Sequence, residues 1–395
     1  MSITSVRSLW VSLAGRARKA AGLALVSGAL AACNVALPGG GSGGAGVSGS
    51  GATEVALLVP HGSSRGTDAG VARSLENAAR LAVADLGAGA VNLTVYPTQG
   101  TPGGAAGAAS QAVAAGAQVI LGPLYADNAA AAGVAAAGSN VPVLSFSNNT
   151  SIAGGNVWVL GNTFENTAER LLTYAARQGR NRVLVTHNDQ TAGQIAQAAI
   201  VRAAQGSGAQ VTGSVAYDLS QQGIVSAVPT IAAQARATNS NAVFLTGNTS
   251  GDLPVMAQLL TEAGIGGEEF RFLGLTRWDI PAEAVQLPGL QGGYFALPDP
   301  APGQQFAARY AAANGGNPHP LAGLAYDGMA AIGAIARNGG TVGRSTLTNR
   351  AGFAGTNGVF RLRADGTIQR ALAVAQIVNR QIQVVSPAPN SLAGS

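Results

Sequence analysis

The sequence predicts an α/β fold, in which parallel sheets carry helices on both faces. From Glu54 onward, short runs of β-branched residues or leucine alternate many times with longer amphipathic stretches, which is typical of repeated βαβ units. About 340 residues follow Thr53, more than one hydrophobic core usually serves, so two domains are expected. Aromatic residues make up only 5% of the chain, whereas 56 residues are glycine. Such small side chains favour close packing of helices on sheets.

The segment before this pattern has the organisation of a secretory signal: a basic leader without acids, then an apolar stretch over 20–32. That stretch is short for a membrane span, which needs about 20 apolar residues. It ends in Leu30-Ala31-Ala32-Cys33, which resembles the box before the lipidated cysteine of bacterial lipoproteins. We therefore expect residues 1–32 to be a lipoprotein signal peptide and Cys33 to carry the lipid that anchors the protein to a membrane.

Residues 33–53 are rich in glycine and serine, the composition of a flexible tether. Asn34 follows the cysteine, rather than the aspartate that often retains lipoproteins in the inner membrane, so we expect an outer-membrane lipoprotein facing the periplasm. The net charge of +5 falls to +1 without the four basic residues of the leader: Arg7, Arg16, Arg18 and Lys19. No basic patch is left for nucleic acid, and Cys33, the single cysteine, excludes a disulfide framework.

The first series of elements starts at Glu54. Its apolar runs predict strands at 55–59, 91–96, 119–121 and 143–145, with helices between them. In the helix expected at 69–86, Val71, Leu75, Ala78 and Leu86 recur at helical spacing. This helix therefore packs one face on the sheet.

A second series begins near Phe164. Strands are expected at 182–186, 210–217, 242–245 and 270–273. Among them, Val183-Leu184-Val185 and Val243-Phe244-Leu245 are short continuous apolar runs, typical of strands covered on both faces. The expected helices are 164–178, a helix ending near 204, 225–237 and 253–263. This order again predicts βαβ units.

Beyond Gly292 the pattern changes to one strand, two helices and a terminal segment interrupted by glycine. The strand is expected at 294–296 and the helices at 304–314 and 321–337. Asp365-Gly366 lies between two alternating runs, which indicates a hairpin turn. A further turn is expected over 378–382.

Four segments, in their order and spacing, resemble the type I periplasmic binding-protein fold, in its leucine/isoleucine/valine-binding branch. They are Val119-Ile120-Leu121-Gly122-Pro123, Val141-Pro142-Val143-Leu144-Ser145, Ala325-Tyr326-Asp327-Gly328 and the hairpin from Gly352 to Gly366. The resemblance implies two doubly wound parallel-sheet lobes joined by three crossovers, with the ligand cleft between them. It places lobe 1 at 54–162 plus 297–350, lobe 2 at 163–296 plus 351–386, and a tail at 387–395.

Within that fold, other segments resemble penicillin-binding-protein activator lipoproteins, which stimulate a peptidoglycan synthase. They are 122–128, 145–149, 275–281, Gly293-Tyr294-Phe295-Ala296 and Pro298-Asp299-Pro300. Enterobacterial members carry a helical-repeat domain before this fold, whereas here a short tether precedes Glu54. A function that needs the helical domain is therefore not implied.

The candidate site residues follow predicted strands. Ser147, Asn148 and Asn149 follow the strand at 143–145, and their hydroxyl and amide groups suit a ligand carboxylate; the same residue types also form ordinary turns and helix caps. Tyr125 lies at the mouth of another strand. Asn248 and Thr249 complete this polar set.

The acid expected for a ligand ammonium is less evident. The resemblance places an aromatic ring near Ala192, where this chain has none, and an acid near Thr276 or Arg277, neither of which is acidic. Asp189, Asp252 and Asp279 are possible substitutes, although an aspartate after a strand is more often a helix cap. Arg277, Trp278 and Asp279 are expected to form a cleft wall or a partner anchor, since Trp and Arg are favoured at interfaces; the alternative is that Trp278 only packs.

Nothing in the sequence indicates catalysis. The three histidines, His61, His187 and His319, have no companion at metal-ligand spacing, and we expect them to be polar loop residues. Gly62-Ser63-Ser64 lacks the ending of a phosphate loop. We expect no enzyme activity, no cofactor and no metal.

Two functions follow from these resemblances. The first is a non-catalytic, lipid-anchored regulator that activates a peptidoglycan synthase (penicillin-binding protein) through protein contacts. The alternative is a substrate-binding protein for a leucine-type amino acid or another small polar solute, which delivers its ligand to an ABC permease.

Overall fold

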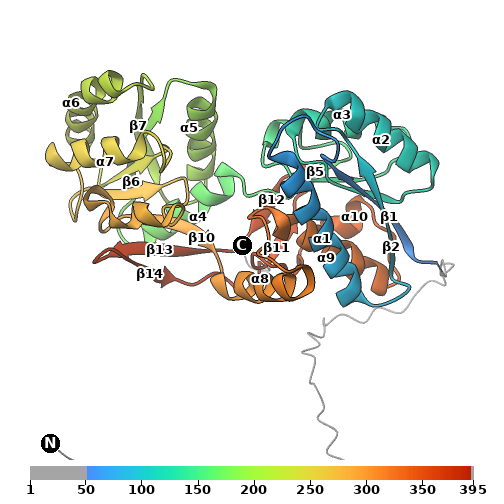
Figure 1. The fold of residues 1–395 in the computed structure, drawn as a ribbon. Coiled ribbons are helices and arrows are strands. Elements are labelled where there is room, and N and C mark those ends of the chain that lie inside the picture. The colour runs from blue at the N-terminus through green and yellow to red at the C-terminus, as the bar shows by residue number, and fades with distance from the viewer. Residues whose placement is uncertain (1–50, 393–395) are drawn as a thin grey trace, which may run out of the picture. The chain divides into compact units, whose positions relative to one another are not determined.

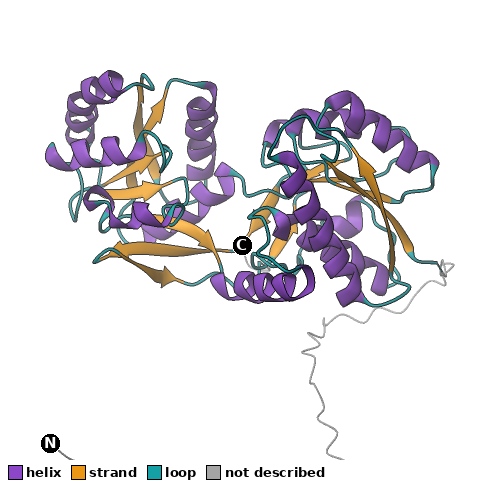
Figure 2. Ribbon diagram, in the orientation of Figure 1, coloured by secondary structure: helices purple, strands orange, loops and turns teal. Residues whose placement is uncertain are grey.

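The computed structural model describes residues 51–392 of the chain. Cys33, the signal peptide and most of the expected tether lie outside these residues. The described part contains two parallel-stranded sheets, each with helices on both faces, which confirms the predicted α/β class (Figures 1 and 2). None of the helices in 51–392 is long and apolar enough to cross a membrane.

The first lobe is built on a five-stranded parallel sheet of order β2-β1-β3-β4-β5. Its strands are β1 (Thr53–Val59), β2 (Val91–Pro97), β3 (Val119–Leu121), β4 (Val143–Ser145) and β5 (Val157–Val159). They alternate with helices α1 (Asp68–Leu86), α2 (Pro102–Ala114) and α3 (Ala126–Ala137), and a 3-10 turn η1 (Thr150–Ile152) precedes β5. Four of the five strands were predicted, and β5 was not.

Both faces of this sheet are buried, as its apolar strands predict. Along β1, Val55, Leu57 and Val59 belong to the core that includes α1, whereas Ala56 and Leu58 belong to the core that includes α2 and α3. Successive strand residues point to opposite faces, so a strand without polar alternation needs a helix layer on each side.

The second lobe contains a seven-stranded sheet of order β14-β13-β10-β9-β8-β6-β7. Its parallel strands are β6 (Arg182–Asn188), β7 (Gln210–Tyr217), β8 (Ala242–Leu245), β9 (Arg271–Gly274) and β10 (Tyr294–Pro298). Strands β13 (Leu372–Val378) and β14 (Gln381–Ser386) add an antiparallel edge. The expected turn over 378–382 is their hairpin, in which Asn379 and Arg380 have φ of 52° and 61°.

Four helices accompany the second sheet: α4 (Phe164–Arg177), α5 (Thr191–Ala204), α6 (Gln221–Ala237) and α7 (Leu253–Glu262). The 3-10 turns η2 (Ala282–Gln286) and η3 (Pro288–Leu290) precede β10. Helix α6 begins four residues before the expected Val225, because the Ser220 side chain accepts a hydrogen bond from Gly223 N and caps the helix. The hydrophobic pattern alone did not reveal that first turn.

The chain returns to the first lobe after β10. Helices α8 (Pro300–Asn314), α9 (Ala322–Arg337) and α10 (Arg344–Leu347) follow, and then a hairpin of β11 (Phe360–Leu362) and β12 (Ile368–Arg370) around Asp365-Gly366. Phe306, Tyr310 and much of α9 share the core of α1 and β1. The expected placement of the two late helices agrees with this packing.

The boundary expected at residue 351 differs from the structure. Phe353, Phe360, Leu362 and Ile368 are buried in the core of the first lobe, so the hairpin packs there and the second lobe resumes only with β13. The expectation missed this because strand pattern does not indicate which neighbouring core covers a hairpin. The chain thus passes between the lobes after β5, after β10 and after β12.

An ion pair with no solvent exposure lies beside the first and third of these passages. Arg370 Nη1 of β12 donates to Asp327 Oδ2 of α9 at 2.7 Å, and both side chains are fully buried. The Asn166 side chain of α4 pairs with the Arg370 backbone, accepting from its N at 2.9 Å and donating to its O at 3.2 Å. Side chains from three elements thereby hold the chain where it enters and re-enters the second lobe.

Candidate functional site

A large pocket lies in the second lobe, at the carboxyl ends of its parallel strands. It has a volume of about 860 Å³. The loops that follow β6, β7, β8 and β9 contribute residues within 188–193, 219–221 and 246–252, together with Thr276. In open α/β sheets this edge is where ligands bind, and the volume lies in the range of small-molecule sites, about 300–1,000 Å³.

The walls of the pocket are mostly apolar. Leu219, in the loop between β7 and α6, is 50% exposed, and Val255 on α7 is 38% exposed. Phe164, the first residue of α4, and Ala192 on α5 also line the pocket. Exposed aliphatic side chains inside a pocket indicate that it receives apolar surface from a ligand.

Close approach of backbone shapes one side of the pocket. A Cβ added to Gly193 would lie 2.2 Å from Asn188 O, so only glycine lets α5 start this close to the end of β6. The family resemblance placed an aromatic ring near Ala192, the residue before Gly193. Because alanine carries only a methyl group, the space beside Phe164 stays open.

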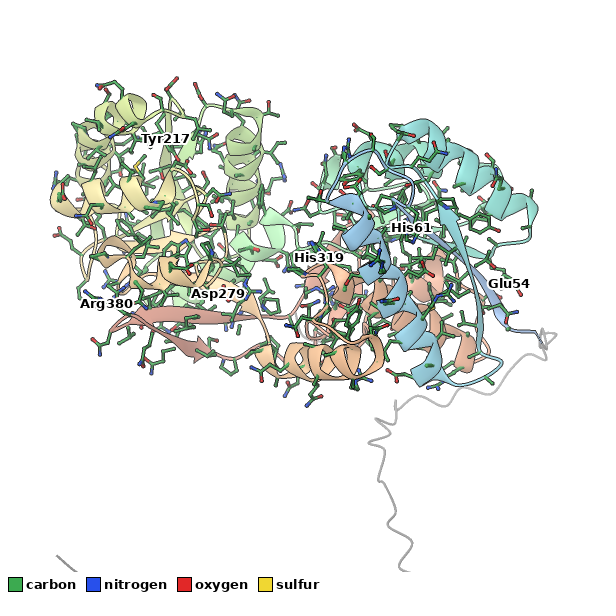
Figure 3. All side chains as sticks on the ribbon, viewed as in Figure 1. Glu54, His61, Tyr217, Asp279, His319 and Arg380 are labelled. Carbon is green, nitrogen blue, oxygen red and sulfur yellow. The ribbon has the colours of Figure 1, made fainter. Side chains whose placement is uncertain are left out.

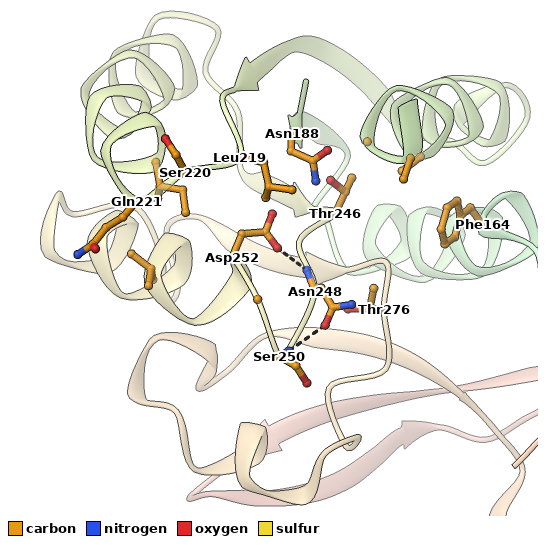
Figure 4. Close-up of a pocket in the computed structure, with 16 residues that line it drawn as sticks. Phe164, Asn188, Leu219, Ser220, Gln221, Thr246, Asn248, Ser250, Asp252 and Thr276 are labelled. Carbon is orange, nitrogen blue, oxygen red and sulfur yellow. Dashed lines mark hydrogen bonds between the residues drawn. The ribbon is translucent and has the colours of Figure 1, made fainter. Parts of the chain in front are cut away.

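A buried carboxylate is the one charged group among the residues that line the pocket. Asp252, 6% exposed, accepts a hydrogen bond from Tyr217 Oη at 2.5 Å on Oδ2 and from Asn248 N at 2.7 Å on Oδ1. Figure 4 shows Asp252 beside Asn248, with Leu219 close by. Burial, and next the hydrogen bond to Asp252, raise the pKa of Tyr217, so the phenol stays protonated and donates to the carboxylate.

Three aspartates were possible substitutes for the acid expected to bind a ligand ammonium, and their surroundings in the structure differ. Asp189 is exposed, accepts from Gln190 Nε2 at 2.8 Å and does not line the pocket. Asp279 is held by Arg277, whose Nε donates to Asp279 Oδ1 at 2.8 Å while Nη2 bonds Oδ2. Asp252 alone of the three lies in the pocket wall.

Of the residues predicted after β8, Asn248 lines the pocket and accepts from Ser250 N through its side chain. Thr249 instead donates through its hydroxyl to Ile280 O at 2.7 Å, which ties this loop to the loop after β9. Thr276 from that second loop also lines the pocket. Asn248 is thus a wall residue, whereas Thr249 braces the wall.

Trp278 is neither a cleft wall nor an exposed anchor, and this expectation is wrong. Its side chain is fully buried in the core of the second lobe, 5.9 Å between ring centroids from Phe295. A Cβ on Gly274 or Gly293 would lie 2.2 or 2.5 Å from its ring atoms. The two glycines leave room for the indole inside the lobe, so neighbouring polar residues were a misleading guide to its exposure.

The predicted residues after β4 form a turn with a helix cap, and two of them line a smaller cavity. Ser147 is buried and its Oγ accepts from Asn149 N, and the Asn149 side chain accepts from Ser151 N and caps η1. These hydrogen bonds are those of an ordinary turn and a helix cap, the alternative to ligand binding for these residue types. Asn148 and Asn149 also line a smaller cavity of about 200 Å³, together with Phe164, Ala192 and other residues of α4 and α5.

Tyr125 forms a second tyrosine–aspartate pair, in the first lobe. Its hydroxyl donates to Oδ1 of the buried Asp68 at 2.5 Å, and Arg65 Cζ lies 4.5 Å from the centre of its ring. Burial, and next the hydrogen bond to Asp68, raise the pKa of Tyr125, while Arg65 acts in the opposite direction. Tyr125 lines none of the cavities above, so the structure assigns it a bracing role at the start of α1.

Comparison with known proteins supports this architecture. A family model described as "Periplasmic binding protein" matches residues 54–381. The chain belongs to the periplasmic binding protein family. Family membership implies a periplasmic location, and the penicillin-binding-protein activator group receives no support from these comparisons. The comparison with curated proteins found no match.

Solved structures show the same fold at low sequence identity. A putative branched-chain amino acid ABC transporter protein from Rhodospirillum rubrum is 18% identical, with a TM-score of 0.69, over 85% of this chain and 100% of that one. A leucine-, isoleucine-, valine-, threonine- and alanine-binding protein from Brucella ovis is 18% identical, with a TM-score of 0.60, over 86% and 94%. A leucine-binding protein from Thermotoga maritima is 18% identical, with a TM-score of 0.54, over 85% and 98%. At this identity the likeness establishes the fold.

The histidines of this periplasmic binding protein have local partners. His61 Nε2 lies 2.9 Å from Glu76 Oε2, and His319 N donates to Ser74 Oγ at 2.8 Å, so both lie beside α1 (Figure 3). His187 Nδ1 bonds Asn188 O. Within residues 51–392, no three His, Cys, Asp or Glu side chains are grouped as metal ligands.

Phe164, Leu219 and Val255 are among the wall residues of this binding protein that sequence reasoning missed. Leu219 could have been found, because an isolated leucine between the strand at 210–217 and the following helix is an apolar residue in a loop at the ligand-binding edge. Phe164 and Val255 carried no such signal, since each fits the apolar pattern of its own helix.

Proposed function

We propose that this periplasmic binding protein is a solute receptor, which captures a small molecule in the pocket of its second lobe and delivers it to an ABC permease. The observation that carries the proposal is the pocket itself: about 860 Å³ at the carboxyl edge of the sheet, with exposed apolar side chains and one buried carboxylate. The family and the ligands of similar solved structures support it, including a Rhodopseudomonas palustris solute-binding protein in complex with benzoate.

The pocket has the features of a binding site rather than an active site. Its wall residues are apolar side chains, amides, hydroxyls and a single carboxylate. Nucleophilic catalysis needs a base beside the nucleophile, and no histidine, lysine or cysteine lines this pocket. Reversible capture therefore explains the wall better than chemical turnover.

Filling the pocket is expected to abolish ligand binding. Leu219→Trp places an indole in the open space, where half of the leucine side chain is already exposed, so we expect at least tenfold weaker binding with unchanged folding. The measurement is calorimetric titration and thermal shift of the full chain with a panel of amino acids, aromatic acids, amines and short peptides.

The matched control is Val134→Trp, which makes the same kind of change on α3, where the side chain is 80% exposed and lines no cavity described above. It should leave binding unchanged. Absence of a thermal shift across the whole panel would contradict the receptor function, as would equal loss of binding in the two variants.

We further propose, from Leu30-Ala31-Ala32-Cys33 and the Asn34 that follows, that a lipid on Cys33 holds the receptor at the outer membrane, facing the periplasm. Cys33→Ser is expected to move the protein from the membrane fraction to the soluble periplasmic fraction, because the acceptor thiol is lost. Fractionation with immunodetection, together with the mass of the mature N-terminus, measures this. A Cys33→Ser variant that stays in the membrane fraction would refute the lipid anchor. Unaltered protein in the inner-membrane fraction would refute the outer-membrane localisation.

The activator function remains the other candidate from the sequence. Its support is the local resemblance of segments such as 275–281, within which Trp278 is buried and so unavailable to a partner. Recovery of a peptidoglycan synthase by the full chain, with stimulation of glycan polymerisation, would favour it over the receptor function.

A further inference from the structure

No cationic side chain among the described residues forms an ion pair with Asp252, although a buried aspartate normally has such a partner. Asp252 is 6% exposed and makes no ion pair among the described residues. Aspartate is almost never this buried unless it is paired, and burial of an unpaired charge is costly. The pocket beside it is the side from which a partner can arrive.

Asp252 is the acceptor in both of its hydrogen bonds. Asn248 N can only donate, and Tyr217 donates its hydroxyl hydrogen, so the carboxylate acts as an acceptor on both oxygens. Its place at the start of α7 adds the positive end of the helix dipole. Each oxygen keeps a further lone pair for a donor from the pocket.

Helix capping does not account for this geometry. Asp252 is the N-cap residue of α7, yet its side chain makes no capping hydrogen bond to that helix. It bonds backward to Asn248 N and sideways to Tyr217 of β7. These contacts fix the carboxylate at the pocket wall, where an ordinary cap would turn it toward α7.

The wall contains no cationic side chain that could form an ion pair with a ligand carboxylate. No arginine, lysine or histidine lines the pocket, and a ligand anion there would meet Asp252 with like charge. Leu219 and Val255 present exposed aliphatic surface to the same space. The volume, about 860 Å³, also exceeds what the smallest ligands need.

We propose, resting on the receptor function above, that the ligand is a protonated amine with an apolar body, whose ammonium binds Asp252 while the body packs on Leu219 and Val255. Tyr217 positions the carboxylate and does not itself contact the ligand. The proposal distinguishes this receptor from binders of simple organic anions.

The test compares amines with isosteres that differ in charge. Tryptamine, tryptophol and indole-3-propionate share one apolar body, and phenethylamine, 2-phenylethanol and 3-phenylpropionate share another. Each is titrated calorimetrically into the full chain. The amine of each set is expected to bind at least tenfold more tightly than its alcohol, roughly the effect of a hydrogen bond to a charged group, and the carboxylate is expected to bind most weakly.

Asp252→Asn keeps the size of the side chain and removes its charge, so the preference for the amine should disappear. Asp189→Asn is the matched control: it makes the same change at an exposed aspartate outside the pocket and should preserve the preference. If Asp252→Asn lowers thermal stability, the binding of amine, alcohol and carboxylate to the unaltered chain still tests the preference for the amine.

The outcomes separate the two proposals. Tighter binding of the carboxylates, or equal binding of amine and alcohol, would overturn the amine assignment and leave the receptor function standing. The same holds where Asp252→Asn folds and retains the preference for the amine. Failure of every probe and of the wider solute panel to bind would overturn the receptor function itself.

Discussion

Replacement of Arg370 by methionine is expected to lower the free energy of unfolding by about 3–5 kcal/mol, the usual cost of leaving one charge of a buried pair without its partner. The uncompensated charge is Asp327, which is fully buried on α9. Methionine keeps the length of the arginine stem, so the loss comes from charge and hydrogen bonding more than from packing.

The surroundings of Arg370 explain why so large an effect is expected. Its guanidinium lies 4.9 Å from the centre of the Phe360 ring, and Asp327 Oδ1 also accepts from Thr356 N and, at 2.9 Å, from Thr356 Oγ1. A Cβ on Gly355 would lie 2.6 Å from the Asp327 carboxylate. The site is closed on every side, and water cannot replace the missing partner.

Urea denaturation followed by far-UV circular dichroism measures the effect. Arg309→Met is the control, because the Arg309–Asp85 pair has side chains that are 47% and 37% exposed, and exposed pairs contribute about 0–1 kcal/mol. Asp327→Leu combined with Arg370→Met should recover part of the loss, since no buried charge remains. Equal effects of Arg370→Met and Arg309→Met would contradict the buried pair.

Truncation of Trp278 to alanine is expected to destabilise the second lobe by about 3–5 kcal/mol, typical of Trp→Ala in a core. The indole has no solvent exposure and packs against Phe295 and the backbone of Gly274 and Gly293. Its removal leaves a cavity that these rigid neighbours cannot fill.

The same variant distinguishes a core role of Trp278 from a role as a partner anchor. A core tryptophan predicts a lower urea midpoint by circular dichroism, with Trp278→Phe intermediate because it keeps an aromatic ring. A partner anchor predicts unchanged stability and weaker binding to a synthase. Ile280→Ala is the control, since this neighbour is 53% exposed and should change stability by less than about 0.5 kcal/mol.

The local pattern of apolar and polar residues predicted most of the strands and helices. The strands expected at 119–121, 143–145, 210–217 and 242–245 have the observed bounds. Helix starts were less accurate: α8 begins at Pro300 rather than 304, capped by Asp299, whose side chain accepts from Ala301 N. Strand β5, which is three residues long, was not predicted.

The site was predictable only in part. Asn248 was expected from its place after a strand, and Asp252 was one of three aspartates that sequence alone left equivalent. Arg277 paired with Asp279, and Asp189 lay outside the pocket, so contacts between loops made the choice. Trp278 shows the opposite case: its polar neighbours indicated a surface residue, whereas Gly274 and Gly293 leave room for its ring in the core.

Alternating apolar and amphipathic segments therefore determined the α/β class and the order of the elements, since each segment of this kind can bury its apolar face in only a few ways. Tertiary structure decided which lobe covers the hairpin of β11 and β12, and which acid faces the pocket. Those outcomes depend on contacts between residues distant in sequence, such as Tyr217 with Asp252 and Asp327 with Arg370. Burial and charge pairing are properties of the packed chain, and they leave Asp252 without an ion pair among the described residues at the carboxyl edge of the second sheet.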